Sequence, residues 1–324
     1  MRLSMENGII LFGGGKLLIK FASYLKINHQ ILVITSPRYE KEMIEGNKFT
    51  DILTEMNLKV IITKKLSPDV LKLIKAKTLG ISFGAPWIFK KDIIDIFNGQ
   101  LFNNHPTNLP TGRGGAPVSW NIIKGVPKIY STLHQVTEGI DDGDLVYKHE
   151  YEFIETKITP KIYHEKSIIY DFENLKNFIE KIDKGFKFKL IKQNENDSEY
   201  LPRLNTSIHG VIDWTISIKK LKRFILAFSD PYIGAWTFLN DDFENKIHIK
   251  SVEILSKKKK YHPFQWGLII NIIDKKYDIA VKGGILRVSD LYMKNETKIR
   301  LGDRLNSPRV YIDKAYSHRA TYNP

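Results

Sequence analysis

The sequence contains no cysteine among its 324 residues. Disulfide bonds, cysteine-ligated zinc, iron–sulfur clusters and a thiol nucleophile are therefore excluded. Long apolar runs are also missing, since no stretch approaches the ~18 apolar residues of a membrane span. The apolar run near the start, residues 9–12, is shorter than the ~7–15-residue apolar region of a signal peptide. We therefore expect a cytoplasmic protein that has no membrane partner.

The glycine-rich turn at residues 13–15 lacks the two patterns that identify a nucleotide-binding loop. Leu18 stands where a dinucleotide fingerprint has its last glycine, and Lys16 is not followed by serine or threonine, as a P-loop requires. The favoured interpretation is a tight turn that lets a strand and a helix pack closely. The alternative is a backbone contact of Gly13 and Gly14 to a ligand phosphate at the start of the helix.

Positive charge is in excess, and most of the excess lies in the last third of the chain. Lysine and arginine exceed the acidic residues by 14. Residues 1–200 hold 28 basic and 24 acidic side chains, whereas residues 201–324 hold 22 and 12. Such a field attracts polyanions, among them nucleic acid, anionic lipid and nucleotide phosphates. A lysine-rich composition that serves solubility is an equally weighted alternative.

Strand and helix patterns alternate in the first half of the chain. Helix-like segments separate five short apolar runs, at residues 9–12, 31–34, 58–62, 79–83 and 100–103. This alternation predicts βαβ units and a mostly parallel, Rossmann-like sheet. Ligands of such sheets bind beyond the carboxyl ends of the strands. Two more strands and a long amphipathic helix are predicted to follow, at residues 129–136, 145–153 and 162–182.

A different pattern follows the six consecutive polar residues 193–198, which are the best candidate for a linker. A helix is predicted first, and several short strands with turn signals between them come next, at residues 218–228, 235–239, 246–255, 267–273, 277–281 and 285–291. Such strands are typical of a small barrel of the OB-like kind. We therefore expect an α/β protein with an N-terminal domain at residues 1–196 and a smaller, β-rich domain at residues 205–324.

The densest polar segment follows the strand predicted at residues 100–103. Asn103 and His105 are two positions apart, so on an extended chain both side chains point to the same side. Histidine is the usual general acid or base near neutral pH, and a neighbouring carboxamide can hold a carbonyl oxygen or an oxyanion. Asp141 lies 36 residues after His105 and precedes an Asp-Gly turn. It is a candidate for the carboxylate that orients the histidine or accepts a proton.

This constellation resembles the folate-dependent formyltransferase family. The family pattern is Asn-x-His, then Leu-Pro and a glycine-containing loop, then Asp-x-Gly about three dozen residues on. Other segments are similar to the family as well, so the resemblance covers nearly the whole chain. The matching residues are Asn103 and His105, Leu109 and Pro110, Gly112 to Gly114, Asp141 and Gly143, the stretch 80–87, HGVIDW at 209–214 and SDPYIGAWTFL at 229–239.

The resemblance implies that a formyl group moves from 10-formyltetrahydrofolate to a primary amine, with no metal. Asn103 and His105 would stabilise the tetrahedral oxyanion, and His105 would donate a proton to the leaving folate nitrogen. Asp141 would set the protonation of His105 and help to remove a proton from the amine. The implied folate contacts, made largely by backbone, are Ser82, Phe83, Gly84, Ala85, Trp87, Ile88, Glu138, Ile140, Asp142 and Asp144.

Three branches of the family act on different amines. The glycinamide ribonucleotide enzymes are single-domain proteins, and this chain is too long for them. Methionyl-tRNA formyltransferases have the right size, and the basic last third would suit an RNA backbone. However, that branch has a basic, glycine-rich insertion near the second strand, whereas residues 36–48 here hold three basic and three acidic side chains. The tRNA enzyme is therefore the alternative function. We expect the protein to bind nucleic acid only if that alternative is correct.

The favoured branch is that of the sugar nucleotide N-formyltransferases, which includes the enzyme for UDP-4-amino-4-deoxy-arabinose. GGAPVSWNI at residues 114–122, with Trp120, is most similar to this branch. The implied substrate is a nucleotide-linked amino sugar, and the product would enter bacterial lipopolysaccharide O-antigen, capsule or a flagellar glycan. Arg113 is a candidate contact for the diphosphate. In this family the C-terminal domain either supports the catalytic domain or forms a homodimer.

Overall fold

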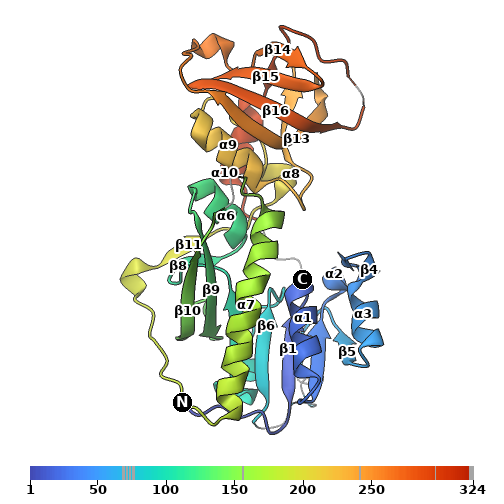
Figure 1. Cartoon of the computed structure of the whole chain (residues 1–324), viewed down its shortest axis with the longest axis vertical. Helices are drawn as coiled ribbons and strands as arrows, with labels where there is room; N and C mark the ends of the chain where they lie inside the picture. Colours follow the sequence, from blue (N-terminus) through green and yellow to red (C-terminus); the bar gives the residue numbers. More distant parts are fainter. Residues whose placement is uncertain are drawn as a thin grey trace.

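The structure is a computed structural model that describes residues 1–67, 70, 72, 74, 77–154, 157–240, 242–295 and 297–320. Two main sheets, one in each half of the chain, follow one another along the long axis of the molecule (Figure 1). The helices of the described part are α1 (Lys16–Leu25), α2 (Pro37–Glu40), α3 (Phe49–Glu55), α5 (Lys91–Ile96), α6 (Pro117–Lys124), α7 (Pro160–Asp183), α8 (Thr206–His209), α9 (Ile218–Ala227) and α10 (Arg309–Ser317), with 3-10 turns η1 (Glu195–Asp197) and η2 (Pro263–Gln265).

The sheet of the N-terminal half is mostly parallel, as the alternating pattern predicts. In the described part of the chain its strands lie side by side in the order β10 (Leu145–Glu152), β9 (Lys128–Gln135), β7 (Leu101–His105), β6 (Leu79–Phe83), β1 (Ile9–Gly13), β2 (Ile31–Thr35) and β5 (Lys59–Ile62). The strands from β7 to β5 run parallel, and β9 and β10 extend the sheet in antiparallel fashion. The Rossmann-like fold is confirmed.

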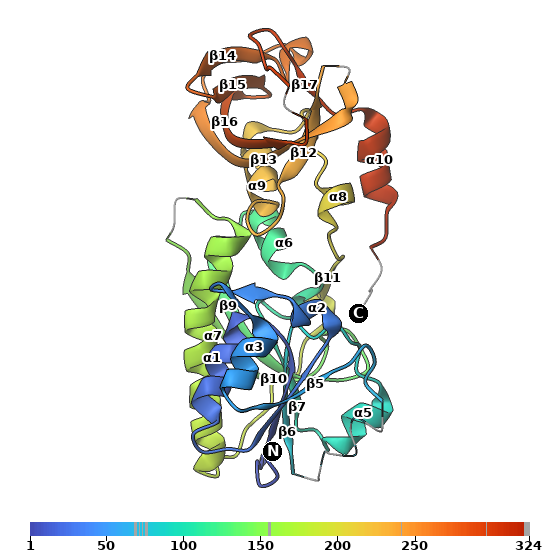
Figure 2. The same ribbon diagram turned by 90° about the vertical axis from the view of Figure 1, so that its right-hand side faces the viewer.

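The central strand β1 shows how the sheet is covered on both faces. Successive side chains of a strand point to opposite faces. Ile9 and Leu11 accordingly pack into one hydrophobic cluster with residues of α1 and α7, whereas Ile10 and Phe12 pack into another with Ile93 of α5. Figure 2 shows α1, α3 and α7 on one side of the sheet and α5 on the other. A run of apolar residues is therefore typical of this strand, because neither of its faces meets water.

The C-terminal half contains an antiparallel sheet that curls into a barrel. Within the described residues its strands lie in the order β14 (Ile269–Ile273), β15 (Lys276–Val281), β16 (Gly284–Met293), β13 (Asp242–Ser256), β12 (Ala235–Leu239) and β17 (Leu305–Asn306). Its two edges meet, because Leu268 pairs with Arg304 across the gap between β14 and β17. This closure protects the edge strands from pairing with another chain.

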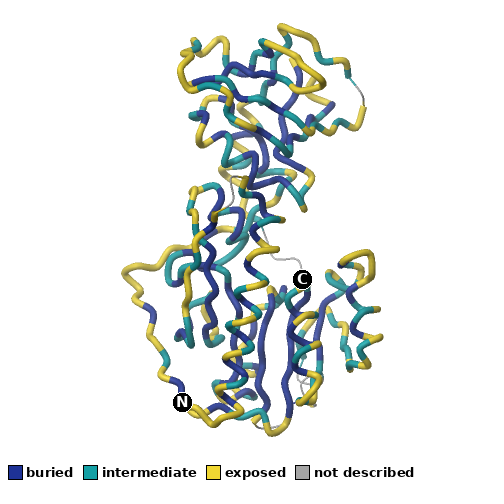
Figure 3. The backbone as a smooth tube through the Cα atoms, in the orientation of Figure 1, coloured by how far each residue is buried: buried dark blue, intermediate teal, exposed yellow. Residues whose placement is uncertain are grey.

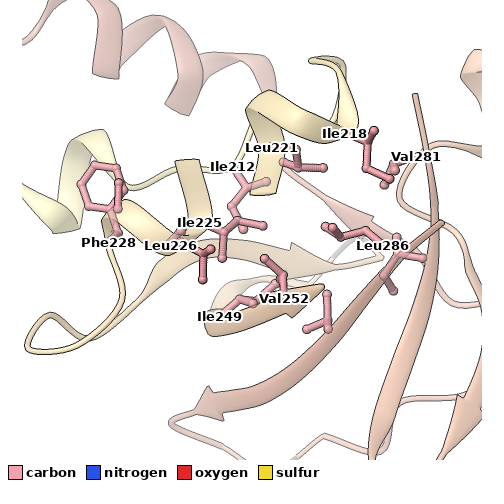
Figure 4. Packing of buried hydrophobic residues seen from close by; sticks show 14 of the residues in the cluster. Ile212, Ile218, Leu221, Ile225, Leu226, Phe228, Ile249, Val252, Val281 and Leu286 are labelled. Carbon is pink, nitrogen blue, oxygen red and sulfur yellow. The ribbon is translucent and has the colours of Figure 1, made fainter. Parts of the chain in front are cut away.

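A continuous hydrophobic cluster joins the two halves. Val118 and Ile122 of α6 are buried in the same cluster as Leu221 and Ile225 of α9 and as strands of the barrel. Figure 3 shows buried backbone running through this junction, and Figure 4 shows the residues of α9 that face β13. The hydroxyl of Ser119 on α6 also donates to the carbonyl of Ala227 at 2.9 Å.

The polar run at residues 193–198 packs against the N-terminal half instead of acting as a free linker. Gln193 is buried, and β11 (Glu199–Leu201), which follows the run, pairs in parallel with β8 (Thr111–Gly114). The interpretation of these residues as a linker is therefore corrected. Polarity misled it, because Gln193 and Glu195 have a hydrogen-bond partner in Arg113, although residues 194–198 are exposed. The domain limits at residues 196 and 205 stay a prediction.

Candidate active site

Strand β7 places the Asn-x-His pattern at the carboxyl edge of the parallel sheet. Asn103 and His105 share one face of the strand, because side chains alternate. The neighbouring strands supply residues on both sides of Asn103, since the register sets Ser82 of β6 and His134 of β9 opposite it. The pattern therefore lies where parallel sheets hold their ligands.

Asp141 reaches both predicted residues from the loop between β9 and β10. Its Oδ1 lies 3.3 Å from Asn103 Nδ2, and its Oδ2 lies 3.7 Å from His105 Nε2. The backbone amide of Gly114 donates to Oδ2 at 2.9 Å. The structure thus brings the three predicted residues together from segments that lie far apart in the sequence.

The ring of His105 has a defined orientation. Its Nε2 lies 3.0 Å from the carbonyl oxygen of Gly112. A carbonyl oxygen can only accept, so Nε2 carries a proton. The side chain is only 8% exposed, so that its position is set by the protein and not by water. The glycine-containing loop after Leu109-Pro110 therefore orients the histidine.

The carboxyl of Asp141 stays ionised although it is buried. Burial by itself raises the pKa of a carboxyl group, because it disfavours the charged form. The charges of His105 and His134, a hydrogen bond to His134 and the amide of Gly114 outweigh burial and hold the pKa of Asp141 well below its usual value of 3.8. The site therefore contains a negative charge that faces both imidazole rings.

The loop of the Asp-x-Gly pattern requires glycine at position 143, because the backbone of Gln135 lies too close for a side chain. A Cβ atom on Gly143 would lie 2.0 Å from the backbone oxygen of Gln135, so no other residue fits there. Asp141 itself has a positive φ of 52°. The hydroxyl of Thr137 donates to the carboxylate of Asp142. This hydrogen bond keeps the Asp142 carboxylate within its own loop. Asp141 is thus the carboxylate that faces the histidines.

His134 is a fourth member of the site, which the sequence did not indicate. Its Nε2 lies 3.4 Å from Asp141 Oδ1 and 3.2 Å from Asn103 Nδ2, and its Nδ1 lies 2.7 Å from the backbone oxygen of Gln135. A carbonyl oxygen can only accept, so Nδ1 carries a proton, and Nε2 faces both Asp141 and Asn103. Only the pairing of β9 with β7 brings this histidine to Asn103, and no motif in the sequence records that pairing.

Most of the chain matches known formyl transferases. Two family descriptions apply, "Formyl transferase" over residues 30–168 and "Formyl transferase, C-terminal domain" over residues 206–309. A methionyl-tRNA formyltransferase of Francisella tularensis subsp. holarctica is 30% identical over 245 residues, which cover 75% of this chain and 71% of that protein. The chain belongs to the formyl transferase family. It is a formyltransferase. The formyl donor of this family is 10-formyltetrahydrofolate.

Solved structures share the two-domain fold of this formyl transferase. An N-formyltransferase from Helicobacter canadensis, crystallised with folinic acid and dTDP-3-aminofucose, has a TM-score of 0.67 at 18% identity and covers 88% of this chain and 99% of its own. The methionyl-tRNA formyltransferase from Clostridium thermocellum has a TM-score of 0.52 at 20% identity and covers 78% and 94%. At these identities the likeness is one of fold.

The two loops assigned to the folate by resemblance are neighbours in this formyl transferase. Ile88 from the loop after β6 and Glu138 from the loop before Asp141 line one open depression of about 390 Å³. Of the ten implied contacts, two are buried (Ser82, Phe83), four are half-buried (Ala85, Trp87, Asp142, Asp144) and four are exposed (Gly84, Ile88, Glu138, Ile140). Their contacts with folate stay a prediction.

The glycine-rich turn packs closely against neighbouring segments, and its phosphate contact stays a prediction. A Cβ atom on Gly13 would lie 2.1 Å from the backbone oxygen of Phe83. The amide of Gly14 donates to that same oxygen at 3.3 Å, and the ring of Tyr39 covers Gly14. The amide of Gly14 thus has an acceptor inside the chain, which supports the packing role.

A substitution at Gly13 tests this packing role. We expect Gly13→Ala to lower the free energy of unfolding by about 2–4 kcal/mol, because Ala adds a backbone clash to an unfavourable positive φ. Gly46→Ala is the matched control, since Gly46 has a φ of +90° but no atom within 4 Å of a Cβ. Urea unfolding of both variants measures the difference. Equal losses would contradict the clash with Phe83.

Arg113 is turned into the protein, and its contact with the diphosphate stays a prediction. Its Nε and Nη2 donate to Gln193 Oε1 at 3.2 and 2.9 Å, and Nη1 and Nη2 donate to the Glu195 carboxylate at 2.9 and 2.7 Å. The residue is 8% exposed. Because these contacts occupy most of its N–H groups, the guanidinium has little left for a ligand. The sequence could not show that its acceptors lie 80 and 82 residues further on.

Two further findings concern the described residues only. They contain no cluster of histidine, aspartate and glutamate side chains arranged to hold a metal ion. None of their helices is long and apolar enough to cross a membrane.

Proposed function

We propose that this formyltransferase moves the formyl group of 10-formyltetrahydrofolate to the primary amine of a nucleotide-linked amino sugar, for the biosynthesis of a surface glycan. The contact of Asp141 with Asn103, His105 and His134 carries the chemical part of the proposal. The absence of net charge in residues 36–48 is the observation that favours a sugar amine over the amine of methionyl-tRNA.

The reaction consists of an attack by the amine on the formyl carbon and the departure of the folate nitrogen. The neutral amine attacks the formyl carbon, and the carbonyl electron pair moves to oxygen to form a tetrahedral oxyanion. The bond from this carbon to the folate nitrogen then breaks, the nitrogen takes a proton, and the amine gives one up. Asn103 and His105 can donate hydrogen bonds to the oxyanion. The contacts of Asn103 Nδ2 are long, 3.2 and 3.3 Å, so an entering oxygen competes with them.

The low pKa of Asp141 restricts its part in this scheme. A carboxylate whose pKa lies well below 3.8 is a weak base by itself. We therefore assign it an electrostatic part: its negative charge faces His105, which protonates the leaving nitrogen. It also attracts the positive charge that develops on the attacking amine. The amine proton then leaves through an imidazole or water beside Asp141.

The segment at residues 36–48 favours a small substrate over a tRNA. It follows β2 and contains α2 and the short strands β3 (Met43–Ile44) and β4 (Asn47–Lys48). Its three basic side chains are matched by three acidic ones. Glu45 pairs with Lys16, and the hydroxyl of Tyr39 donates to the backbone oxygen of Gly84 at 2.6 Å. A segment without net charge offers little attraction to an RNA backbone, whose binding depends on positive charge.

Transfer to initiator methionyl-tRNA is the second candidate function. The relatives in sequence favour it, as the enzyme of Francisella tularensis subsp. holarctica carries that name. The excess of positive charge after residue 200 favours it too. The Helicobacter canadensis structure, which contains dTDP-3-aminofucose, supports the sugar instead.

Mass spectrometry of one turnover assay decides between the two amines. Purified protein is mixed with 10-formyltetrahydrofolate and a pool of UDP-, dTDP-, GDP- and CMP-linked amino sugars. A parallel tube contains charged initiator methionyl-tRNA. We expect a formyl mass increment on one nucleotide sugar, and no increment when the same assay uses His105→Ala. An increment on the tRNA alone would replace the sugar by the second candidate.

A further inference from the structure

The side chain of Gln193 is bonded to the loop that carries Asp141. Gln193 is 5% exposed. Its Nε2 donates to the backbone oxygen of Asp141 at 2.9 Å and to that of Gly143 at 2.7 Å. Two N–H groups of one amide thus hold the two carbonyls that flank the turn of the Asp-x-Gly pattern. Because a carboxamide has two donors, its donor capacity is filled.

The oxygen of the same amide is hydrogen-bonded as well. Oε1 of Gln193 accepts from Nε and Nη2 of Arg113, at 3.2 and 2.9 Å. The carboxylate of Glu195 binds the outer edge of the same guanidinium, at 2.9 and 2.7 Å. Arg113 therefore fixes Gln193 in one orientation, and the amide cannot flip without placing its NH₂ against a cation.

These contacts form a closed frame around the catalytic carboxylate. Arg113 precedes Gly114, whose amide donates to Asp141 Oδ2 at 2.9 Å. Strand β8 therefore binds the carboxylate of Asp141 through Gly114, and it binds the backbone of Asp141 through Arg113 and Gln193. Asp141 has a φ of 52°, which a residue with a side chain adopts only when its surroundings impose it.

We propose that Gln193 is a positioning residue for formyl transfer. Its amide holds the Asp141 loop so that the carboxylate stays against His105, His134 and Asn103. The proposal rests on the proposed function for its catalytic consequence, but the frame itself is independent of which amine is formylated. Without the two donors, the backbone oxygens of Asp141 and Gly143 lose their buried partners and the loop relaxes.

Gln193→Met and Gln193→Glu test this proposal. Met has nearly the same shape but no hydrogen-bonding groups, whereas Glu keeps acceptors for Arg113 and loses both donors. We expect each variant to lower kcat by about 10–100-fold, because a displacement near 1 Å at the reacting groups costs a factor of that order. The KM for the amine should change by less than about 2-fold. Asn196→Met is the matched control on the same segment, since Asn196 is exposed.

Nitrogen NMR of labelled histidine provides a readout that needs no substrate. The imidazole signals of His105 and His134, assigned with His105→Ala and His134→Ala, should shift in both Gln193 variants and stay in place in Asn196→Met. Unchanged signals together with wild-type kcat in Gln193→Glu would overturn the proposal. If the wild-type protein formylates neither amine, the proposed function fails, and the histidine signals alone decide on the frame. If Gln193→Met does not fold, Gln193→Glu decides.

Discussion

Asp141→Asn is expected to lower kcat by about 10²–10⁴-fold, the usual contribution of a positioned acid or base. Asparagine keeps the shape of the side chain and an oxygen for the amide of Gly114, but it removes the charge between His105 and His134. The positive charge that develops in the transition state then loses its compensating carboxylate, so formyl transfer becomes slower. Initial rates with formyl donor and amine measure the effect, and KM should change little.

His105→Ala is expected to show a loss of the same order, because it removes the group that donates the proton. Far-UV circular dichroism and thermal unfolding of both variants serve as controls for the fold. The double variant should lose little more than either single one, since the two residues act together. Turnover like that of the wild-type enzyme in either single variant would remove the catalytic assignment.

Asp171→Asn is expected to stabilise the protein above neutral pH. Asp171 lies on α7, behind β7, and is fully buried. Burial raises the pKa of its carboxyl from 3.8 to about 7, and the hydroxyl of Ser131 and the amide of Asn104 offset only part of that effect. Its Oδ1 has no hydrogen-bond partner among the described residues. The carboxyl is therefore neutral in the folded protein below pH 7 and charged above it.

The pH dependence of this effect follows from the two pKa values. The unfolded chain releases the proton near pH 4, whereas the folded protein holds it until about pH 7. Between these values the folded state binds more protons, so the stability falls as the pH rises. Above pH 7 both states are charged and the full penalty is present. The difference between the two pKa values corresponds to an upper limit of about 4 kcal/mol.

Urea unfolding at pH 5 and pH 8 tests this expectation. At pH 5 the neutral Asp171 and the asparagine should differ by less than about 1 kcal/mol. At pH 8 the variant should be the more stable protein by roughly 2–4 kcal/mol. Glu173→Gln, an exposed change on the same helix, should shift stability equally at both pH values. A variant that is less stable than the wild-type protein at pH 8 would show that a partner holds the charged form of Asp171.

Local sequence was a good guide to the elements, and it singled out Asn103, His105 and Asp141, which the structure brings together. The apolar run of β1 and the alternation of strands and helices predicted the parallel sheet, because burial on both faces demands apolar residues at every position. The strand expected at residues 235–239 is β12 (Ala235–Leu239), and the helix expected at residues 162–182 is α7 (Pro160–Asp183). The last helix, α10, was not anticipated.

Contacts between distant segments were beyond the reach of the sequence. His134 joins the site only through the register of β9 with β7. Polarity at residues 193–198 suggested a linker, yet Gln193 is buried and bonded to Arg113 and to the Asp141 loop. Arg113 was expected to face a diphosphate, and in the structure it faces Gln193 and Glu195. In each case the residue type indicated a polar contact, but the sequence could not identify the residue that makes this contact.

The sequence by itself determined the class of fold, the family and the residues Asn103, His105 and Asp141, because periodicity and motif spacing are local properties of the chain. Tertiary structure alone decided that Asp141 stays charged, that His134 joins it, and that Gln193 and Arg113 hold its loop. The physical reason is that a pKa and a hydrogen-bond partner depend on burial and on the charges within a few ångströms. Those neighbours come from β7, β8, β9 and the segment before β11, which only folding brings together.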